Sequence, residues 1–384
     1  MLKSDLDHVL FSGAYVLCLI DAMIFGYSTF SALPFAGTIS LGLRTGAAAL
    51  ILIKLILDRY YSLGSLLNLI TVGLILLITY VRSGYSHIFY MMIVCLGLRG
   101  VEEERVISMD FWLRSGLSVL IASCGLLGLI EHYVTYRTGS AVLRYSVGFN
   151  HPNTAASLVL SLILEEAWIK RRHATGFYTV VLWIIAAVTY LVTANRTAVL
   201  IMLCFPILLF GVRDDGGDSP EENGRGSALA ALFPLAAIFS YSTMIQCRSS
   251  ELFRMIDRAM SNRFYNAKVI FGAYGVPLLG QKVALISVKT ARLTNSSIAL
   301  LDVAYLRLLI QAGPVVLVLL GILFGWAMKR ARKDGDYLRI LILTVFILFG
   351  LCESGFNNVF MNFSILFAAK ALFRAEKSSE EVAL

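Results

Sequence analysis

The stretch RYSVGFNHPNT, residues 144–154, concentrates polar groups between two apolar runs of a chain that is otherwise mostly hydrophobic. It carries a guanidinium, an imidazole and two asparagine amides, and its proline marks a position where a new helix can begin. So many polar groups beside a lipid bilayer are unfavourable unless they line a water-filled cavity or bind a ligand. We therefore interpret the stretch as half of an active site that faces the outside of a membrane.

The composition of the 384 residues indicates a membrane protein built from α-helices. Hydrophobic residues make up 58% of the chain and charged residues only 15%, which is more apolar surface than a water-soluble core needs. A spanning helix needs roughly 20 apolar residues, and the short alternating segments of a membrane β-barrel are absent from the sequence. We predict an all-α polytopic protein with about twelve transmembrane helices in one integral membrane domain, residues 1–384.

The apolar runs give the positions of the predicted spans. They lie near residues 9–30, 37–57, 64–80, 87–99, 113–131, 153–168, 177–193, 197–212, 228–246, 298–326, 339–354 and 357–374. The tenth run is long enough to tilt in the membrane or to break at Gly313-Pro314, because proline cannot continue the hydrogen bonds of a helix. Residues 213–227 are rich in glycine and acidic side chains, which predicts a flexible cytoplasmic loop without a catalytic role.

Lysines and arginines in the short loops predict the orientation in the membrane. With twelve spans most of these cations fall on one side, which is therefore cytoplasmic and holds both termini. The segment 247–297 is the exception, because it lies outside on this topology and yet carries an excess of cations. Its apolar residues from Leu252 to Phe271 recur at three- and four-residue spacing, which predicts an amphipathic helix at the outer interface of this large extracytoplasmic loop.

Polar features gather on the predicted outer side in the stretch 144–154, in the turn TANRT at residues 193–197, and in the basic loop. An arginine at a helix end can be held rigidly, and its planar guanidinium suits paired hydrogen bonds to phosphate. Taken alone, Arg196 fits an interfacial anchor better, and His151 before Pro152 fits the cap of a helix as well as a catalyst. The case for function is the coincidence of these features on one face.

The six cysteines form no CxxC pair, so we predict neither a disulfide nor a metal cluster.

Local patterns at these positions resemble the Wzy-type polysaccharide polymerases, a family grouped with the O-antigen ligases. Residues 144–153 resemble the RxxxGFxHPN signature of Gram-positive capsule and exopolysaccharide polymerases, and residues 193–198 resemble the TxSRTA turn. Residues 262–281 resemble the NRxxxA…PLxG(Q/I) stretch, and residues 302–313 resemble the DNxYLxLLLxxG entry to the next span. Asn195 replaces the usual small hydroxyl residue and Val303 the usual asparagine, and both departures keep the neighbouring charged residue.

The resemblance implies an inverting glycosyltransferase that needs no metal or cofactor, in the cytoplasmic membrane of a bacterium and with its active site outside. The donor would be a growing glycan on undecaprenyl diphosphate. The acceptor would be a sugar hydroxyl at the non-reducing end of a lipid-linked repeat unit. A chain-length regulator and a flippase are candidate partners besides the bilayer, and nucleic acid is not a partner.

The reaction so implied assigns roles to the candidate residues. Preformed cations lower the barrier by stabilising the charge that develops on the departing diphosphate, and a base must accept the proton of the acceptor hydroxyl. The catalytic candidates are Arg196 for the diphosphate, His151 for the acceptor hydroxyl, and Asp302 or Glu353 as the reserve base. The candidate substrate-binding residues are Arg144, Asn150, Asn153, Asn195, Arg263 and Tyr305. Arg263 is expected at the diphosphate, and Arg144 at the diphosphate or the reducing-end sugar.

Other functions fit part of the sequence. An O-antigen-type ligase shares the fold and the donor but transfers the glycan to another acceptor, such as the lipid A core. A transporter or flippase also fits twelve spans, but transporters place polar residues near the membrane midplane and show internal repeats. A third alternative is a purely structural membrane protein, but in that case the cations of the basic loop would have no ligand.

Overall fold

The computed structural model of the protein describes residues 3–58, 63–136, 142–212, 228–286 and 300–373. Within these residues the chain is mostly helical, and its paired strands form one short two-stranded sheet. The predicted cytoplasmic loop at 213–227 lies outside the described residues. The chain folds into two compact units, each assembled from three segments of the sequence.

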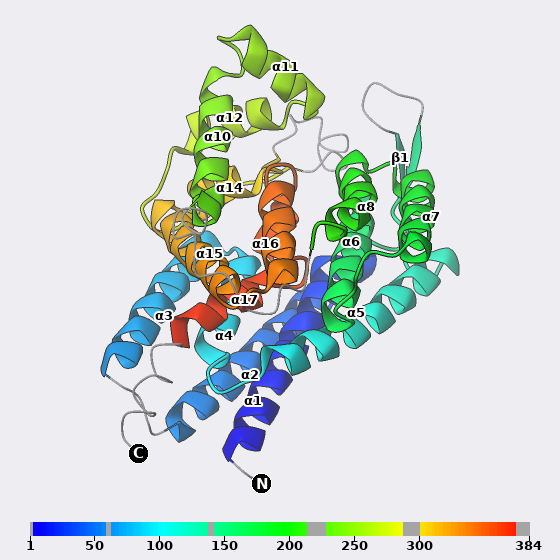
Figure 1. Ribbon diagram of the computed structural model, residues 1–384. Helices are drawn as coiled ribbons and strands as arrows, with labels where there is room; N and C mark the ends of the chain where they lie inside the picture. The colour runs from blue at the N-terminus through cyan, green and yellow to red at the C-terminus, as the bar shows by residue number, and fades with distance from the viewer. Residues whose placement is uncertain (1–2, 59–62, 137–141, 213–227, 287–299, 374–384) are drawn as a thin grey trace. The chain divides into compact units, whose positions relative to one another are not determined.

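Unit 1 consists of Met1–Ser62, Ile93–Asp214 and Tyr337–Ile342. Its elements are α1 (Lys3–Ile20), a π-helical turn (Asp21–Gly26), a 3-10 turn (Thr29–Ala32), α2 (Ala36–Leu57), α5 (Glu103–Leu126), β1 (Val134–Tyr136), β2 (Leu143–Tyr145), α6 (Pro152–Ile169), α7 (Gly176–Thr193) and α8 (Arg196–Leu209). The long helices α1 and α2 pack along each other, and α6 contacts α5, α7 and α8 (Figure 1). The antiparallel strands β1 and β2 lead directly into the stretch at 144–154.

Unit 2 consists of Leu63–Met92, Asp215–Asp336 and Leu343–Leu384. Its elements are α3 (Leu63–Ser83), α10 (Leu232–Gln246), α11 (Glu251–Ala259), α12 (Arg263–Tyr274), α14 (Ala304–Arg307), a π-helical turn (Leu308–Ala312), α15 (Pro314–Lys333), a 3-10 turn (Ser354–Asn357), α17 (Ser364–Lys370) and a 3-10 turn (Ala371–Phe373). Helix α10 packs against α12, α14 and α15. Two of the unit boundaries fall inside helices, one in α4 (Ser86–Gly97) and one in α16 (Tyr337–Phe349).

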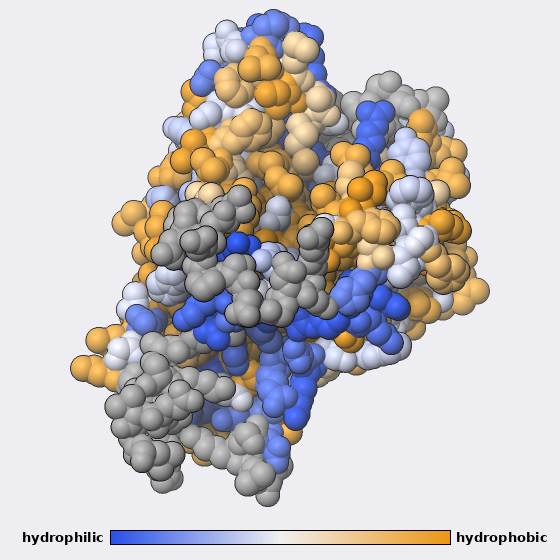
Figure 2. Space-filling view, viewed as in Figure 1, coloured by the Kyte–Doolittle hydropathy of each residue, from blue (hydrophilic) through white to orange (hydrophobic). Residues whose placement is uncertain are grey.

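The length and the apolar composition of the helices indicate a membrane protein. Among the described residues, six helical segments are long and apolar enough to cross a bilayer: Asp5–Gly26, Ala36–Leu57, Leu63–Ser83, Glu103–Leu126, Gly176–Thr193 and Pro314–Lys333. Many of their leucine, isoleucine and valine side chains are exposed, and Figure 2 shows hydrophobic residues over much of the visible surface. A surface of this kind suits lipid rather than water.

Helix α5 begins ten residues before the predicted span at 113–131, and the charged residues Asp110 and Arg114 within it are paired inside the unit. The guanidinium of Arg114 forms an ion pair with Asp110 at 3.0 Å and another with Glu165 of α6, and it donates a hydrogen bond to Ser161 at 2.9 Å. The side chains of all three ionic residues are fully buried. Buried charges are tolerated when they are paired with good geometry, so the charged turn can remain helical within an apolar unit.

The predicted break in the tenth span is confirmed. Gly313 has a φ of 95° and Pro314 opens α15, so the helical segment ends and restarts there. In the described part of the twelfth predicted span, residues 357–373, the helical elements after the turn that ends at Asn357 are the short helix α17 and a final 3-10 turn. The first part of this span is irregular because buried asparagine side chains bind backbone groups, as where the Asn357 amide donates to the carbonyl oxygen of Ala304 at 3.0 Å.

The amphipathic segment from Leu252 to Phe271 forms two helices rather than one. Ser261 and Asn262 both have a φ of 59°, a left-handed conformation that ends α11 and turns the chain into α12. The buried carboxylate of Asp257 accepts the backbone N–H of Phe264 at 2.9 Å and thereby caps the first turn of α12. Leu252 and Met255 on α11 remain exposed.

Candidate functional site

The stretch 144–154 forms a tight turn between β2 and α6 whose glycine is required by the packing of unit 1. Gly148 has a φ of 79°, which non-glycine residues rarely adopt. A Cβ atom at Gly148 would lie 2.5 Å from the carbonyl oxygen of Ile121, because the backbone of the turn presses against α5. Two features of the structure therefore require glycine at position 148: the left-handed backbone conformation and the close approach of the turn to α5.

A second segment, residues 26–29, holds this turn in place. The backbone N–H of Asn150 donates to the carbonyl oxygen of Tyr27 at 2.8 Å, and its side-chain amide donates to that of Gly26 at 2.7 Å. Thr29 returns a backbone hydrogen bond to Gly148 at 3.1 Å. The other end of the Asn150 amide accepts a hydrogen bond from the hydroxyl of Thr154 at 3.0 Å. Asn150, predicted to bind substrate, thus uses both ends of its amide to shape the loop.

Arg144 joins the turn to the second motif. Its Nε atom donates to the carbonyl oxygen of Thr193 at 2.8 Å, and its Nη2 atom donates to the side-chain oxygen of Asn153. The backbone N–H of Asn153 in turn donates to Nδ1 of His151 at 3.0 Å. A continuous line of hydrogen bonds therefore runs from the imidazole, through Asn153 and Arg144, to the end of α7.

His151 is the N-cap of α6, with extended backbone and its side chain bound to the second helical N–H. This contact makes Nδ1 an acceptor, so the neutral imidazole carries its proton on Nε2. The Nε2 atom of that tautomer is a donor. The geometry thus suits a hydrogen bond from His151 to an anion or a hydroxyl oxygen better than removal of a proton by Nε2.

The TANRT turn places Arg196 at the first position of α8. Ala194 has a φ of 47°, which reverses the chain directly after α7, and Asn195 caps α8 by accepting the N–H of Ala198 at 2.9 Å. Asn195, another predicted substrate ligand, is buried in this role, whereas Arg196 is exposed. A guanidinium beside the free N–H groups of a helix start strengthens the attraction for an anion.

In unit 2 the two remaining sequence patterns meet. The backbone N–H of Gly280 donates to the carbonyl oxygen of Ala312 at 2.8 Å, and that of Gln281 donates to Gln311 at 3.0 Å. The side chain of Gln281 also donates to the carbonyl oxygen of Ile310 at 2.9 Å. Gly313 has no side chain, so the backbone of residues 277–278 can lie directly against it. A Cβ atom at position 313 would clash with the backbone carbonyl oxygens of those two residues. The stretch at 262–281 is therefore anchored on the stretch at 302–313.

Arg263 pairs with both predicted reserve bases. Its Nη2 atom lies 3.0 Å from Oε1 of Glu353, and its Nε atom lies 3.8 Å from Oδ2 of Asp302. Burial disfavours the charged guanidinium, but the two carboxylates outweigh that effect and raise the pKa of Arg263 above its ordinary value. The side chain of Asp302 is 33% exposed and that of Glu353 only 10%, so Asp302 is the more accessible base.

Tyr305, predicted to bind substrate, belongs to the packed interior of unit 2. It is 1% exposed, and its hydroxyl donates to the carbonyl oxygen of Ile347 at 2.7 Å. Its ring packs against those of Phe233 and Phe356. The structure therefore gives Tyr305 a packing role, with its one polar atom already paired.

Arg307 is a cation that the sequence analysis did not single out. Its guanidinium lies over the ring of Tyr85 at 4.4 Å, and it donates from Nε to Gln311 at 3.1 Å and from Nη1 to Ser354 at 3.2 Å. Ser354 directly follows Glu353, so Arg307 is held next to the partner of Arg263. The available signal was an arginine within the apolar run that follows Asp302.

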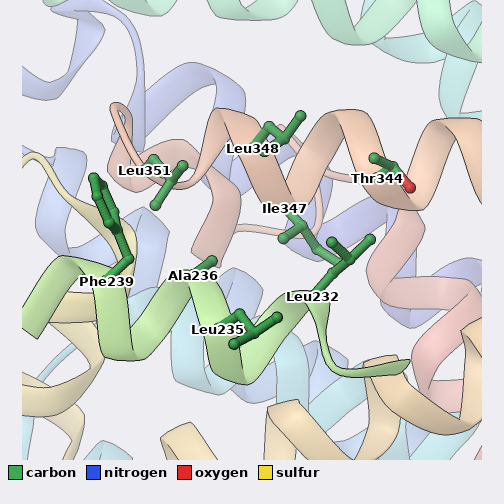
Figure 3. A pocket seen from close by; sticks show the side chains of 8 residues that line it. All are labelled: Leu232, Leu235, Ala236, Phe239, Thr344, Ile347, Leu348 and Leu351. Carbon is green, nitrogen blue, oxygen red and sulfur yellow. The ribbon is translucent and has the colours of Figure 1, made fainter. Parts of the chain in front are cut away.

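An apolar pocket of about 190 Å³ lies between α10 and α16 (Figure 3). It is lined by Leu232, Leu235, Ala236, Phe239, Thr344, Ile347, Leu348 and Leu351. Apart from the Thr344 hydroxyl the lining offers no side-chain hydrogen-bonding group, so the pocket is not a place for sugar or phosphate chemistry.

The structure thus gathers the candidate residues into two polar groups, one in each unit. Unit 1 brings together Arg144, Asn150, His151, Asn153, Asn195 and Arg196, and unit 2 brings together Arg263, Asp302 and Glu353 with Arg307 beside them. No family model, no curated protein and no solved structure matches this chain. A function must therefore be argued from these residues and their contacts.

Proposed function

We propose that the protein is a membrane glycosyltransferase that polymerises a polysaccharide. It transfers a growing glycan from undecaprenyl diphosphate to a sugar hydroxyl at the non-reducing end of a lipid-linked repeat unit, with inversion and without a metal. The lipid-diphosphate-linked oligosaccharide is its substrate and the bacterial cytoplasmic membrane its location. The proposal rests on the resemblance of the polar stretches to Wzy-type polymerases and on the chemistry of the two polar groups.

The observation that carries the proposal is the pair of hydrogen bonds made by Arg144. They tie the RYSVGFNHPNT stretch to the TANRT turn, so two patterns far apart in the sequence act as one polar group beside His151 and Arg196. A transferase that releases a diphosphate needs preformed cations at the leaving group. Arg196 and Arg144 supply those cations in this proposal, and the Nε2–H of His151 adds a neutral donor.

A carboxylate is the candidate base of the reaction. The acceptor hydroxyl must lose a proton as the new glycosidic bond forms. Asp302 fits this task because its carboxylate is partly exposed and only loosely paired with Arg263. Glu353 holds Arg263 at a shorter distance and orients it. In this assignment the role of Arg263 is to position the two carboxylates, and it does not bind the diphosphate on its own.

The experiment that tests the proposal is direct. The purified protein in detergent is mixed with a lipid-diphosphate-linked repeat unit in the presence of a metal chelator, and the products are separated by size. A ladder of longer glycans is expected. If no ladder forms while the glycan is transferred to an added lipid A core acceptor, the ligase alternative replaces the polymerase. If no ladder forms and the protein, once reconstituted into vesicles, only moves the repeat unit across the membrane unchanged, the protein is a transporter.

The proposed topology has about twelve spans, with both termini in the cytoplasm and residues 247–297 outside. The short-loop cations favour this orientation, and the shorter apolar helices would complete the number of spans. A single cysteine introduced at Leu252, in a background where the native cysteines are replaced, should react with an impermeant thiol reagent from outside the cell. Reaction only after the membrane is permeabilised would overturn the orientation.

A further inference from the structure

The guanidinium of Arg307 is fixed in position by neutral groups. The ring of Tyr85 covers one face of it at 4.4 Å, and the side chains of Gln311 and Ser354 accept hydrogen bonds from Nε and Nη1. A ring face, an amide oxygen and a hydroxyl hold the planar group without neutralising its charge. Arg307 is therefore a cation held in one orientation before any ligand arrives.

The neighbouring arginine, Arg263, differs from Arg307 in that carboxylates surround its charge. Arg263 pairs with the carboxylates of Glu353 and Asp302, so its charge is already balanced by the protein. No carboxylate among the described residues forms an ion pair with Arg307. Of the two cations, Arg307 is thus the one whose charge an external anion would balance.

Arg307 also keeps hydrogen-bond donors for such an anion. A guanidinium has five N–H groups, of which Gln311 and Ser354 take one each. The remaining groups have no acceptor among the described residues, and the side chain is half-buried rather than enclosed. A half-buried site strengthens charge-assisted hydrogen bonds to an oxyanion compared with bulk water.

We propose that Arg307 is an anion-binding residue of unit 2 and that its ligand is the phosphate group of a polyprenyl diphosphate. The inference deepens the proposed function and rests on it for the identity of the lipid. The resemblance does not supply it, because residue 307 falls on an unspecified position of the DNxYLxLLLxxG pattern. The oxyanion is the chemistry recognised, whether it comes from a lipid diphosphate or from free pyrophosphate.

The test measures binding rather than catalysis. Farnesyl diphosphate, inorganic pyrophosphate and farnesol are each titrated into the purified protein, and the shift of the thermal unfolding midpoint gives the affinity. Farnesyl diphosphate should stabilise the wild-type protein and farnesol should not. A response to pyrophosphate as strong as that to farnesyl diphosphate would identify the free anion, rather than the lipid, as the ligand.

Arg307→Gln should weaken the binding of farnesyl diphosphate by roughly tenfold or more, because a charge-assisted contact is lost. Arg330→Gln is the matched control, since Arg330 lies on α15 and is already paired with Asp334 at 3.0 Å. Arg307→Lys keeps the charge and should show a smaller loss, and it decides the question if the glutamine variant does not fold. Unchanged binding in the Arg307 variants, or no stabilisation of the wild type, overturns the proposal. Intact binding without any polymer product would instead count against the proposed function.

Discussion

The Nε atom of Arg144 donates a 2.8 Å hydrogen bond to the backbone carbonyl oxygen of Thr193, 49 residues further along the chain. The bond fixes the end of α7 to the loop that carries His151, and a backbone acceptor makes it insensitive to the side chain at position 193. One arginine therefore links two polar stretches that lie far apart in the sequence.

Arg144→Gln should remove the charge and both hydrogen bonds, and polymer formation should fall by about tenfold or more, since hydrogen bonds to charged groups are among the stronger ones. The rate is measured from the ladder of products with a lipid-linked repeat unit. Arg105→Gln is the control, because Arg105 lies in unit 1 but is exposed and paired with Glu102 at 2.6 Å. Equal rates for the Arg144 variant and the wild type would remove Arg144 from the site.

Replacing His151 by asparagine separates its capping role from its chemistry. Asparagine is a good N-cap residue, so His151→Asn should keep the unfolding midpoint near that of the wild type while product formation is lost. His151→Ala should lose product and also about 1 kcal/mol of stability, because the cap is gone. Normal chain lengthening by the asparagine variant would show that His151 only caps α6.

Gly148→Ala should destabilise the protein more than Gly128→Ala. Both glycines have left-handed backbones, with φ of 79° and 72°, so both substitutions introduce strain of about 1–2 kcal/mol. Only at Gly148 would the new Cβ atom meet backbone, 2.5 Å from the oxygen of Ile121, whereas at Gly128 no atom lies within 4 Å. The two midpoints of thermal unfolding in detergent provide the comparison, and equal losses would contradict the close approach of the turn to α5.

Arg114→Leu should leave the buried carboxyl groups of Asp110 and Glu165 without their cation. Removing one partner of a buried ion pair typically costs about 3–5 kcal/mol, so the unfolding midpoint should fall sharply. The comparison is Arg105→Leu, whose exposed pair with Glu102 contributes at most about 1 kcal/mol. A small loss at Arg114, similar to that at Arg105, would mean that water reaches the charges.

Some features of the candidate site followed from the sequence because they depend on neighbouring residues. The proline at 152 and the polar residues before it predicted the start of α6, and the His151 side chain accepts a hydrogen bond from one of the free N–H groups there, that of Asn153. The arginine in TANRT was expected at a helix end, and it is the first residue of α8. The roles of Asn150 and Tyr305 did not follow, because the partners that occupy their polar atoms are far away in the chain.

The sequence by itself determined the helical class, the apolar segments long enough to cross a membrane, and the break at Gly313-Pro314, because hydrophobicity, helix start signals and proline sterics act over a few residues. Only the tertiary structure decided where the polar side chains find partners. The pairing of Arg114 with Glu165, the support of the Asn150 loop by residues 26–29, and the uncompensated charge of Arg307 all depend on contacts between distant segments. Such contacts form when apolar helix faces pack, and local sequence does not specify which polar groups that packing brings together.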